Sequence, residues 1–328
     1  MKRYFSLLIL AFVFNSCIKT IEFDDKTLAN RLVFNAQITP SDLFTGTVRK
    51  STSILSDASN PNVANGSVKL FENGNLQSEF TFQNGYFAKP QLSFKEGKTY
   101  RVEISADNQT ISAETTIPEP APVLQVDTIS SRTTTGESTM QLTITFRDRL
   151  ETKDYYRIVA REDQTYRIAD QNGNKREYVS PVDLQIIQDD AVFKSVYTNF
   201  SNDVVDLNPE NSYNIFPDDY FEGKEYKLKF KTKSYPGGGG YGYNPIYGSG
   251  NQYGYPELIS GKTTVYFQKI SKDLYNYLKY LKLYDTYKDN PIAEPVPVYS
   301  NIKNGAGIFA GLTINAQLKW EKTYKVSN

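Results

Sequence analysis

The chain has 328 residues, of which 37 are basic and 37 acidic, and it contains one cysteine and no histidine. Histidine is the usual general base near neutral pH and the commonest metal ligand, and a balanced charge offers no basic surface to a nucleic acid. We therefore expect no enzymatic activity, no catalytic residues, no metal site, no cofactor and no nucleic-acid partner. The length suffices for two domains that each bury a core.

Residues 1–16 have the pattern of a bacterial lipoprotein signal peptide. Lys2 and Arg3 give a positive start, and an apolar run of about ten residues follows, too short to span a bilayer as a helix. Small Ser16 precedes Cys17, which is the arrangement required by a signal peptidase that cuts before a lipid-bearing cysteine. We predict that Cys17 carries acyl chains such as palmitate, which anchor the protein to a membrane. The alternative is an ordinary secretory signal followed by an incidental cysteine.

The segment after this cysteine, residues 17–30, is polar and acidic, with Glu22, Asp24 and Asp25 near its middle. We predict that it is a lipidated tether that holds the folded part of the chain away from the membrane.

Residues 31–118 carry the signals of strands and hairpins. Apolar and polar residues alternate over 32–36 and 100–105, as expected for strands with one buried face. The dipeptides Asn73-Gly74 and Asn84-Gly85 favour the positive φ angles of two-residue hairpin turns. Several short strands at this spacing predict an N-terminal antiparallel β-sandwich.

A proline-rich connector, Glu119 to Pro122, separates this region from residues 119–328, which we predict to be a second, β-rich domain. Alternating segments at 142–146 and 226–231 predict further antiparallel strands. The fold expected for the whole chain is therefore mainly β, with two sandwich-like domains in tandem.

The most unusual segment of the second domain is a loop rich in glycine and tyrosine, residues 237–256. Tyrosine rings are flat and amphipathic and can bind a sugar or a partner protein at a modest cost in side-chain entropy. We therefore consider five tyrosines as candidate ligand- or partner-binding residues: Tyr241, Tyr243, Tyr247, Tyr253 and Tyr255. The alternative is a low-complexity surface insertion without a specific role.

One helix is predicted, over residues 271–287. Ser271 is a plausible N-cap, and Asp273 places negative charge in the first turn, where it suits the helix dipole. Tyr275 and Tyr280 fall outside the apolar stripe that we expect to pack on a sheet. The stripe consists of Leu274, Tyr277, Leu278, Leu281 and Tyr284.

The segment from Asn290 to Gly311 combines three prolines with Gly305 and Gly307. Prolines restrict the chain to extended paths, while glycines permit conformations that other residues avoid. We interpret the segment as a crossover that leads from the helix to a last strand over 311–320, although so stiff a loop could also serve as a docking surface.

Asp218, Asp219 and Glu222 form the acidic cluster that best suits a carboxylate-dependent hydrolase. A glycosidase needs two carboxylates about 5–10 Å apart on either side of the bond to be cut. Acids that precede a Gly-Lys turn more commonly form a solvated loop, which is our interpretation here. The spacing also matches no EF-hand calcium loop.

Several of these segments together resemble a known family, the domain-of-unknown-function family numbered four-two-four-nine. The resemblance rests on the signal ending in Cys17, the N-terminal hairpins and three motifs: FPDDYFEGKEYKL, SKDLYNYLKYL and NPIAEPVPVYSNIKNGAGIFAG. Members are outer-membrane lipoproteins typical of Bacteroidota-type bacteria, and their genes commonly stand beside those of TonB-dependent receptors. The resemblance therefore implies location at the outer membrane and a TonB-dependent barrel as partner, and it implies no catalytic residues.

These observations lead us to expect an outer-membrane lipoprotein, anchored through lipid on Cys17, that is a non-enzymatic accessory or binding subunit of a TonB-dependent receptor. Two alternatives remain open. The first is an independent surface lipoprotein that binds a glycan or peptide through the Gly/Tyr-rich loop, and the more remote second is a hydrolase using the acidic cluster. The sequence does not decide which face of the outer membrane the folded part occupies.

Overall fold

The computed structural model describes residues 30–52, 63–132, 138–150, 152–169, 174–197, 209–234, 257–290 and 296–323. The predicted signal peptide and its cysteine, nearly all of the predicted tether, and the Gly/Tyr-rich loop lie outside these residues.

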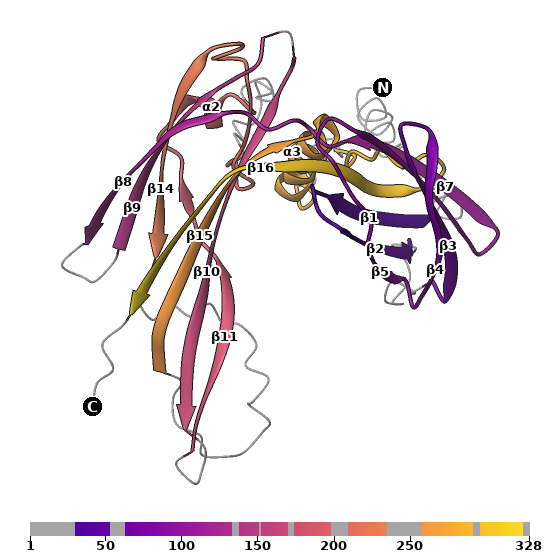
Figure 1. Ribbon diagram of the computed structural model, residues 1–328, viewed down its shortest axis with the longest axis horizontal. Coiled ribbons are helices and arrows are strands. Elements are labelled where there is room, and N and C mark those ends of the chain that lie inside the picture. The colour runs from indigo at the N-terminus through magenta and orange to yellow at the C-terminus, as the bar shows by residue number, and fades with distance from the viewer. Residues whose placement is uncertain are drawn as a thin grey trace, which may run out of the picture.

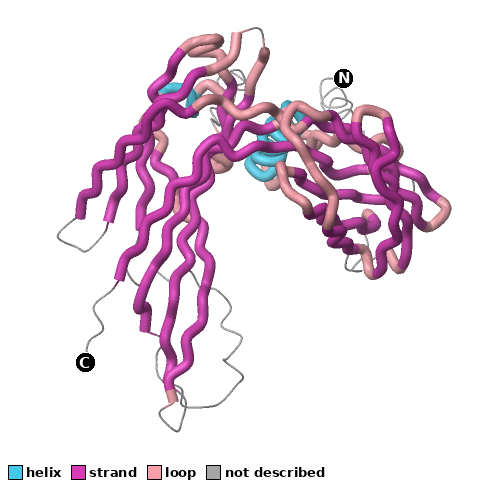
Figure 2. The backbone as a smooth tube through the Cα atoms, viewed as in Figure 1, coloured by secondary structure: helices cyan, strands magenta, loops and turns pink. Residues whose placement is uncertain are grey.

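The chain is mainly β, as predicted (Figures 1 and 2). Its first strands are β1 (Leu32–Ile38), β2 (Leu43–Lys50), β3 (Asn65–Glu72), β4 (Asn75–Gln83), β5 (Tyr86–Pro90), β6 (Thr99–Ala106) and β7 (Gln109–Thr116). The later strands are β8 (Val123–Arg132), β9 (Ser138–Arg147), β10 (Tyr155–Ala169), β11 (Lys175–Asp183), β12 (Ile186–Ile187), β13 (Ile215–Pro217), β14 (Glu225–Ser234), β15 (Glu257–Ile270) and β16 (Ala306–Thr323). The described residues also form two helices, α2 (Ala191–Lys194) and α3 (Lys272–Tyr287). None of the helices in this part of the chain has the length and apolar character needed to cross a bilayer.

Strands β1 to β7 form a sandwich-like unit around a core rich in phenylalanine. The predicted alternation holds, since Leu32 and Phe34 are fully buried and Val33 between them is not. The β3–β4 turn has positive φ at Asn73 (47°) and Gly74 (86°), as a type I′ hairpin turn requires. The alternation of apolar and polar residues along the strands, together with the Asn-Gly residues at the turns, therefore determines the hairpins of this unit.

A second core lies between two sheets in the later part of the chain. One of these sheets contains β8, β9, β14 and β12 in the order β12-β14-β9-β8, and the other contributes β10, β15 and β16. Apolar residues from both sheets are buried together, among them Phe146, Phe230 and Phe267. This pairing of two sheets is the second sandwich-like arrangement.

Strand β16 belongs to both units, a feature that the sequence did not predict. Residues 306–311 pair in parallel with β1, and residues 312–323 pair with β15 in antiparallel fashion. One hydrogen-bonded sheet therefore runs in the order β11-β10-β15-β16-β1-β2-β5-β4-β3-β6-β7. In Figure 1 the yellow β16 extends from the side of β15 to the side of β1. Phe309 is buried in the first core, whereas its neighbour Ile308 packs against the second.

Helix α3 confirms the predicted helix and its cap. The Ser271 side chain accepts a hydrogen bond from the backbone N–H of Leu274 at 3.3 Å. The predicted buried stripe was partly wrong, because Tyr275 is buried and Tyr284 is 42% exposed. The helix packs against β10, β13 and β16 at once. This surface determines the buried face, and it brings the ring of Tyr275 to 4.5 Å from that of Tyr155.

Candidate functional site

Some of the predicted site residues lie within the described part of the chain and others lie outside it. Cys17 and the five tyrosines of the Gly/Tyr-rich loop lie outside the described residues. The structure does place the acidic cluster and most of the crossover that follows α3. It also reveals a polar face on the first unit that the sequence analysis did not identify.

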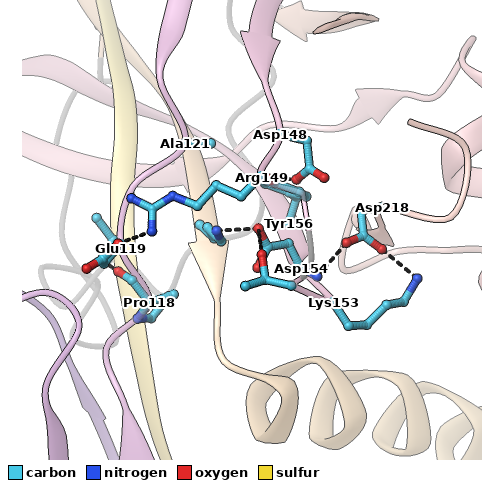
Figure 3. A network of polar contacts seen from close by, with 12 residues as sticks. Pro118, Glu119, Ala121, Asp148, Arg149, Lys153, Asp154, Tyr156 and Asp218 are labelled. Atoms are coloured by element: carbon cyan, nitrogen blue, oxygen red, sulfur yellow. Dashed lines mark hydrogen bonds and ion pairs between the residues drawn. The ribbon is translucent and has the colours of Figure 1, made fainter. Parts of the chain in front are cut away.

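Asp218 of the acidic cluster is fully buried. Its Oδ2 accepts a hydrogen bond from the backbone N–H of Asp154 at 2.6 Å, and its Oδ1 forms an ion pair with Lys153 Nζ at 2.5 Å (Figure 3). Lys153 also contacts Asp219, whose side chain is largely exposed. Burial by itself would lower the pKa of Lys153. The ion pairs with the two aspartates together outweigh that effect, so the pKa of Lys153 is raised.

Two further aspartates extend this polar network toward the core. Asp154 forms an ion pair with Lys269, and burial raises the pKa of Asp154 in spite of that pairing. Asp148 accepts hydrogen bonds from the Tyr156 hydroxyl at 2.5 Å and from the backbone N–H of Gly223 at 3.0 Å. Burial and the bond to Asp148 raise the pKa of the Tyr156 hydroxyl, which therefore stays protonated. The network joins the loop before β10 to the loop after β13.

This geometry gives Asp218 a structural role. Its carboxylate is enclosed, with Oδ2 hydrogen bonded and Oδ1 held by the ion pair alone, whereas Asp219 and Glu222 are exposed. The interpretation of the cluster as a solvated loop is therefore wrong for Asp218. The signal that could have revealed this is the pair of buried residues around it, Phe216 and Phe221, which draw the turn into the core. Within the part of the chain that the structure describes, no group of acidic, cysteine or histidine residues is arranged to hold a metal ion.

The crossover after α3 fastens the two units together. The Asn301 side chain accepts a hydrogen bond from the backbone N–H of Phe309 at 3.0 Å and donates one to the Phe309 carbonyl at 2.7 Å. These are the two hydrogen bonds that a residue on a paired strand would make with Phe309. Lys303 exchanges two backbone hydrogen bonds with Ser112 of β7, at 2.7 and 3.3 Å. Tyr299 donates to Asp273 of α3. These contacts give Tyr299, Asn301 and Lys303 structural roles in the crossover.

The connector between the units is also held against β16. Thr313 Oγ1 donates to the Pro118 carbonyl at 2.5 Å, and the Ala121 backbone N–H donates to Asn315 Oδ1 at 2.9 Å. Glu119 forms an ion pair with Arg149, which Figure 3 shows beside the polar network. The connector is therefore part of the packed structure.

The remaining candidate is the outward face of the first sheet, which we call the Tyr86 face. Register places five residues in one row across β4, β5, β2, β1 and β16, because each is paired with the next. The row consists of Gln83, Tyr86, Thr47, Asn35 and Ile308. Tyr86, at 55% exposure, is one of the most exposed large side chains of the described part of the chain.

Two hollows adjoin on the Tyr86 face, and Tyr86 lines both of them. The first has a volume of about 350 Å³ and lies over β1 and β2, where Asn35, Gln37 and Thr45 line it. The second has a volume of about 530 Å³ and lies over β4 and β5, beside Gln83. Both hollows are shallow and open to solvent, so a ligand there would lie along the sheet.

Comparison with known proteins gave a family match and weak structural similarities. A model described as Domain of unknown function (DUF4249) matches residues 18–317. No curated protein sequence matches the chain. Among solved structures, the BSP domain of a biofilm associated protein has 10% identity and a TM-score of 0.17, over 78% of this chain and 58% of that chain. The B domain of a biofilm associated protein has 8% identity and a TM-score of 0.16, over 92% of this chain and 88% of that chain. Structural similarities this low carry no argument about function.

Proposed function

This chain belongs to the DUF4249 family, and from that membership and its signal sequence we propose that it is a non-enzymatic outer-membrane lipoprotein serving a TonB-dependent receptor as an accessory or binding subunit. The observation that carries the proposal is Cys17, the single cysteine of the chain, placed directly after a short apolar signal.

A lipid anchor makes even a weak receptor interface effective. Acyl chains confine the protein to the plane of the membrane, and confinement raises its effective concentration near a barrel in the same bilayer. The interface therefore needs neither a large area nor a high intrinsic affinity to be occupied.

The fold supports such a role because it joins its two units through a shared strand. Pairing of β16 with both β1 and β15 links the sheets, and the connector is hydrogen bonded to β16 by its ends. A contact made by one unit therefore also positions the other unit at the receptor.

The test is a pull-down of the tagged full-length protein from outer membranes in mild detergent, with mass spectrometry of the bound proteins. We expect a TonB-dependent barrel in near-equal amount, because a subunit is recovered with its partner in fixed proportion. Recovery of the lipoprotein alone, from membranes that contain the barrel, would contradict the proposal.

A Cys17→Ser variant provides the matched control. Without an acylated cysteine it should be absent from the membrane fraction and should recover much less barrel, because the effective concentration falls. Persistence of the variant in the membrane fraction would instead show that something other than lipid on Cys17 holds the protein there.

A further inference from the structure

We propose that the Tyr86 face is a binding site for a neutral oligosaccharide. This inference goes beyond the proposed receptor partnership, since it assigns a ligand class to a surface of the first unit. It rests on the arrangement of uncharged polar side chains around one exposed aromatic ring.

The row across the face has the dimensions of an extended ligand. Neighbouring strands lie about 4.7–4.9 Å apart, so the part of the row from Gln83 to Asn35, which crosses four strands, is about 14 Å long. Ile308 at the end of the row is buried in the second core. Tyr86 lies inside the row, with Gln83 on one side and Thr47 and Asn35 on the other. A short chain of sugars can therefore contact the ring and the polar groups on both sides of it.

The polar groups of the face are free to bind a ligand. None of Asn35, Gln37, Thr47 and Gln83 makes a side-chain hydrogen bond to another residue in the part of the chain that the structure describes. An amide side chain offers both donors and an acceptor, and a threonine hydroxyl can act as either. This combination matches sugar hydroxyls, which also donate and accept.

Tyr86 provides the apolar contact that a sugar ring requires. Its side chain is 55% exposed, and on the same face of β5 the next side chain is that of Ala88, which is small and leaves the ring accessible. A tyrosine ring offers a large flat surface with few rotatable bonds, so its immobilisation costs little entropy. The ring therefore provides stacking, and the neighbouring amides provide orientation.

The face does not suit an anionic polymer. All eight residues that line the first hollow are uncharged, and in the second hollow Lys89 is the charged lining residue. Binding of a polyanion depends on several cations acting together. The chemistry of the two hollows thus favours a neutral ligand, and Arg49, the next outward residue of β2 after Thr47, adds one exposed cation beside them.

Over the first hollow a peptide that adds to a sheet is also disfavoured, because the floor there consists of paired strands. Strand β2 is hydrogen bonded to β1 on one side and to β5 on the other, and β1 is also paired with β16. An extended peptide that adds to a sheet needs an unpaired edge to bind its backbone. Over the first hollow the side chains alone are available, which suits a hydroxyl-rich ligand. Strands β4 and β5 pair only at Gln83 and Tyr86, so unpaired strand edges adjoin the second hollow.

The experiment is a glycan array probed with the full-length protein in detergent. The array carries neutral glucan, xylan and mannan oligosaccharides, with sulfated and sialylated glycans as the acidic set and immobilised peptides alongside. We expect binding to at least one neutral oligosaccharide, and a loss of at least tenfold in Tyr86→Ala, because the stacking surface is removed.

Two variants guard against misinterpretation of that loss. Tyr86→Phe keeps the ring and should retain most of the binding. Tyr220→Ala removes a tyrosine of similar exposure (57%) far along the chain and should leave binding unchanged. Circular dichroism and thermal unfolding of each variant report whether it folds, and the exposed Gln37→Ala tests the polar side of the face if Tyr86→Ala fails to fold.

Three results would overturn the inference. They are the absence of binding to any neutral oligosaccharide, binding to acidic glycans or peptides alone, and neutral binding that Tyr86→Ala leaves intact but that replacement of Tyr241, Tyr243 and Tyr247 by alanine abolishes. The last result would locate the site in the Gly/Tyr-rich loop. Each is separate from the receptor proposal, which the pull-down decides whether or not a glycan is bound.

Discussion

Asp218 and Asp219 are adjacent in sequence and contact the same lysine, yet their environments are opposite. The Asp218 side chain is completely enclosed, whereas that of Asp219 is 57% exposed. Exposed ion pairs contribute little to stability, because water screens them and both side chains lose freedom. A buried acceptor matters more, since its removal leaves an enclosed donor without a partner. Here that donor is the backbone N–H of Asp154.

The two aspartates can therefore be compared directly as alanine variants. Asp218→Ala should lower the free energy of unfolding by about 1–3 kcal/mol, because the Asp154 amide loses its acceptor. Asp219→Ala should change it by less than about 1 kcal/mol. Urea unfolding followed by circular dichroism measures both. Equal losses of unfolding free energy in the two variants would mean that the burial of Asp218 does not determine its contribution to stability.

At the scale of elements, β16 is the strand on which both units depend, and its pairing with β1 requires a close backbone approach. Gly307 has φ of 108°, and a Cβ atom there would lie 2.1 Å from the Phe34 carbonyl oxygen. Because backbone atoms of β1 cannot move aside as a flexible side chain can, only glycine fits this position. The same strand carries Phe309 into the first core and Leu312 into the second.

Substitution of Gly307 by alanine should therefore destabilise the whole protein. Gly74→Ala is the matched control, since that glycine also has positive φ (86°) but nothing within 4 Å of the added Cβ. We expect a loss of about 1–2 kcal/mol at Gly74 from the left-handed backbone alone. At Gly307 we expect at least twice that loss, as measured by thermal unfolding. Similar losses at both glycines would indicate that β16 shifts away from β1 at little cost.

At the scale of the whole molecule, tyrosines are distributed through the second unit with their hydroxyls shielded from water. Burial raises the pKa of Tyr197 and Tyr275. Burial and a hydrogen bond to a carboxylate raise the pKa of Tyr156, Tyr226 and Tyr299. Stability therefore depends on these residues keeping their protons.

We accordingly expect the protein to lose stability in alkali. An unfolded tyrosine loses its proton near pH 10, whereas these folded tyrosines retain theirs, so the folded state binds more protons above that pH. Their contribution is complete below about pH 10 and is lost as the pH rises through the folded-state pKa values. Urea midpoints at pH 8, 9.5 and 11 test this, and they should fall most steeply above pH 10.

Tyr156→Phe is the control for the alkaline effect. The variant should be less stable at pH 8, because Asp148 loses a donor, but its stability should fall less steeply above pH 10 than that of the unaltered protein. A slope equal to that of the unaltered protein would show that ionisation of Tyr156 is not coupled to unfolding.

The sequence by itself determined the local features of the fold, which depend only on a few neighbouring residues. Alternation at β1 and β6, positive φ at Asn73-Gly74 and the Ser271 cap were all predicted, because side-chain period, turn sterics and capping act over at most four residues. The acidic cluster was identified, but the burial of Asp218 was not, since burial depends on what packs over the turn. Lipidation of Cys17 and the role of the Gly/Tyr-rich loop stay predictions from sequence.

Tertiary structure alone decided how distant segments meet. The parallel pairing of β16 with β1 joins residues more than 260 positions apart, and β-strand pairing leaves no local signature that names its partner. The Tyr86 face likewise exists because Gln83, Tyr86, Thr47 and Asn35 come into register from four strands. In the sequence these are ordinary polar positions of separate strands. Only sheet order and register, set by burial of the opposite face in the core, bring them into one row.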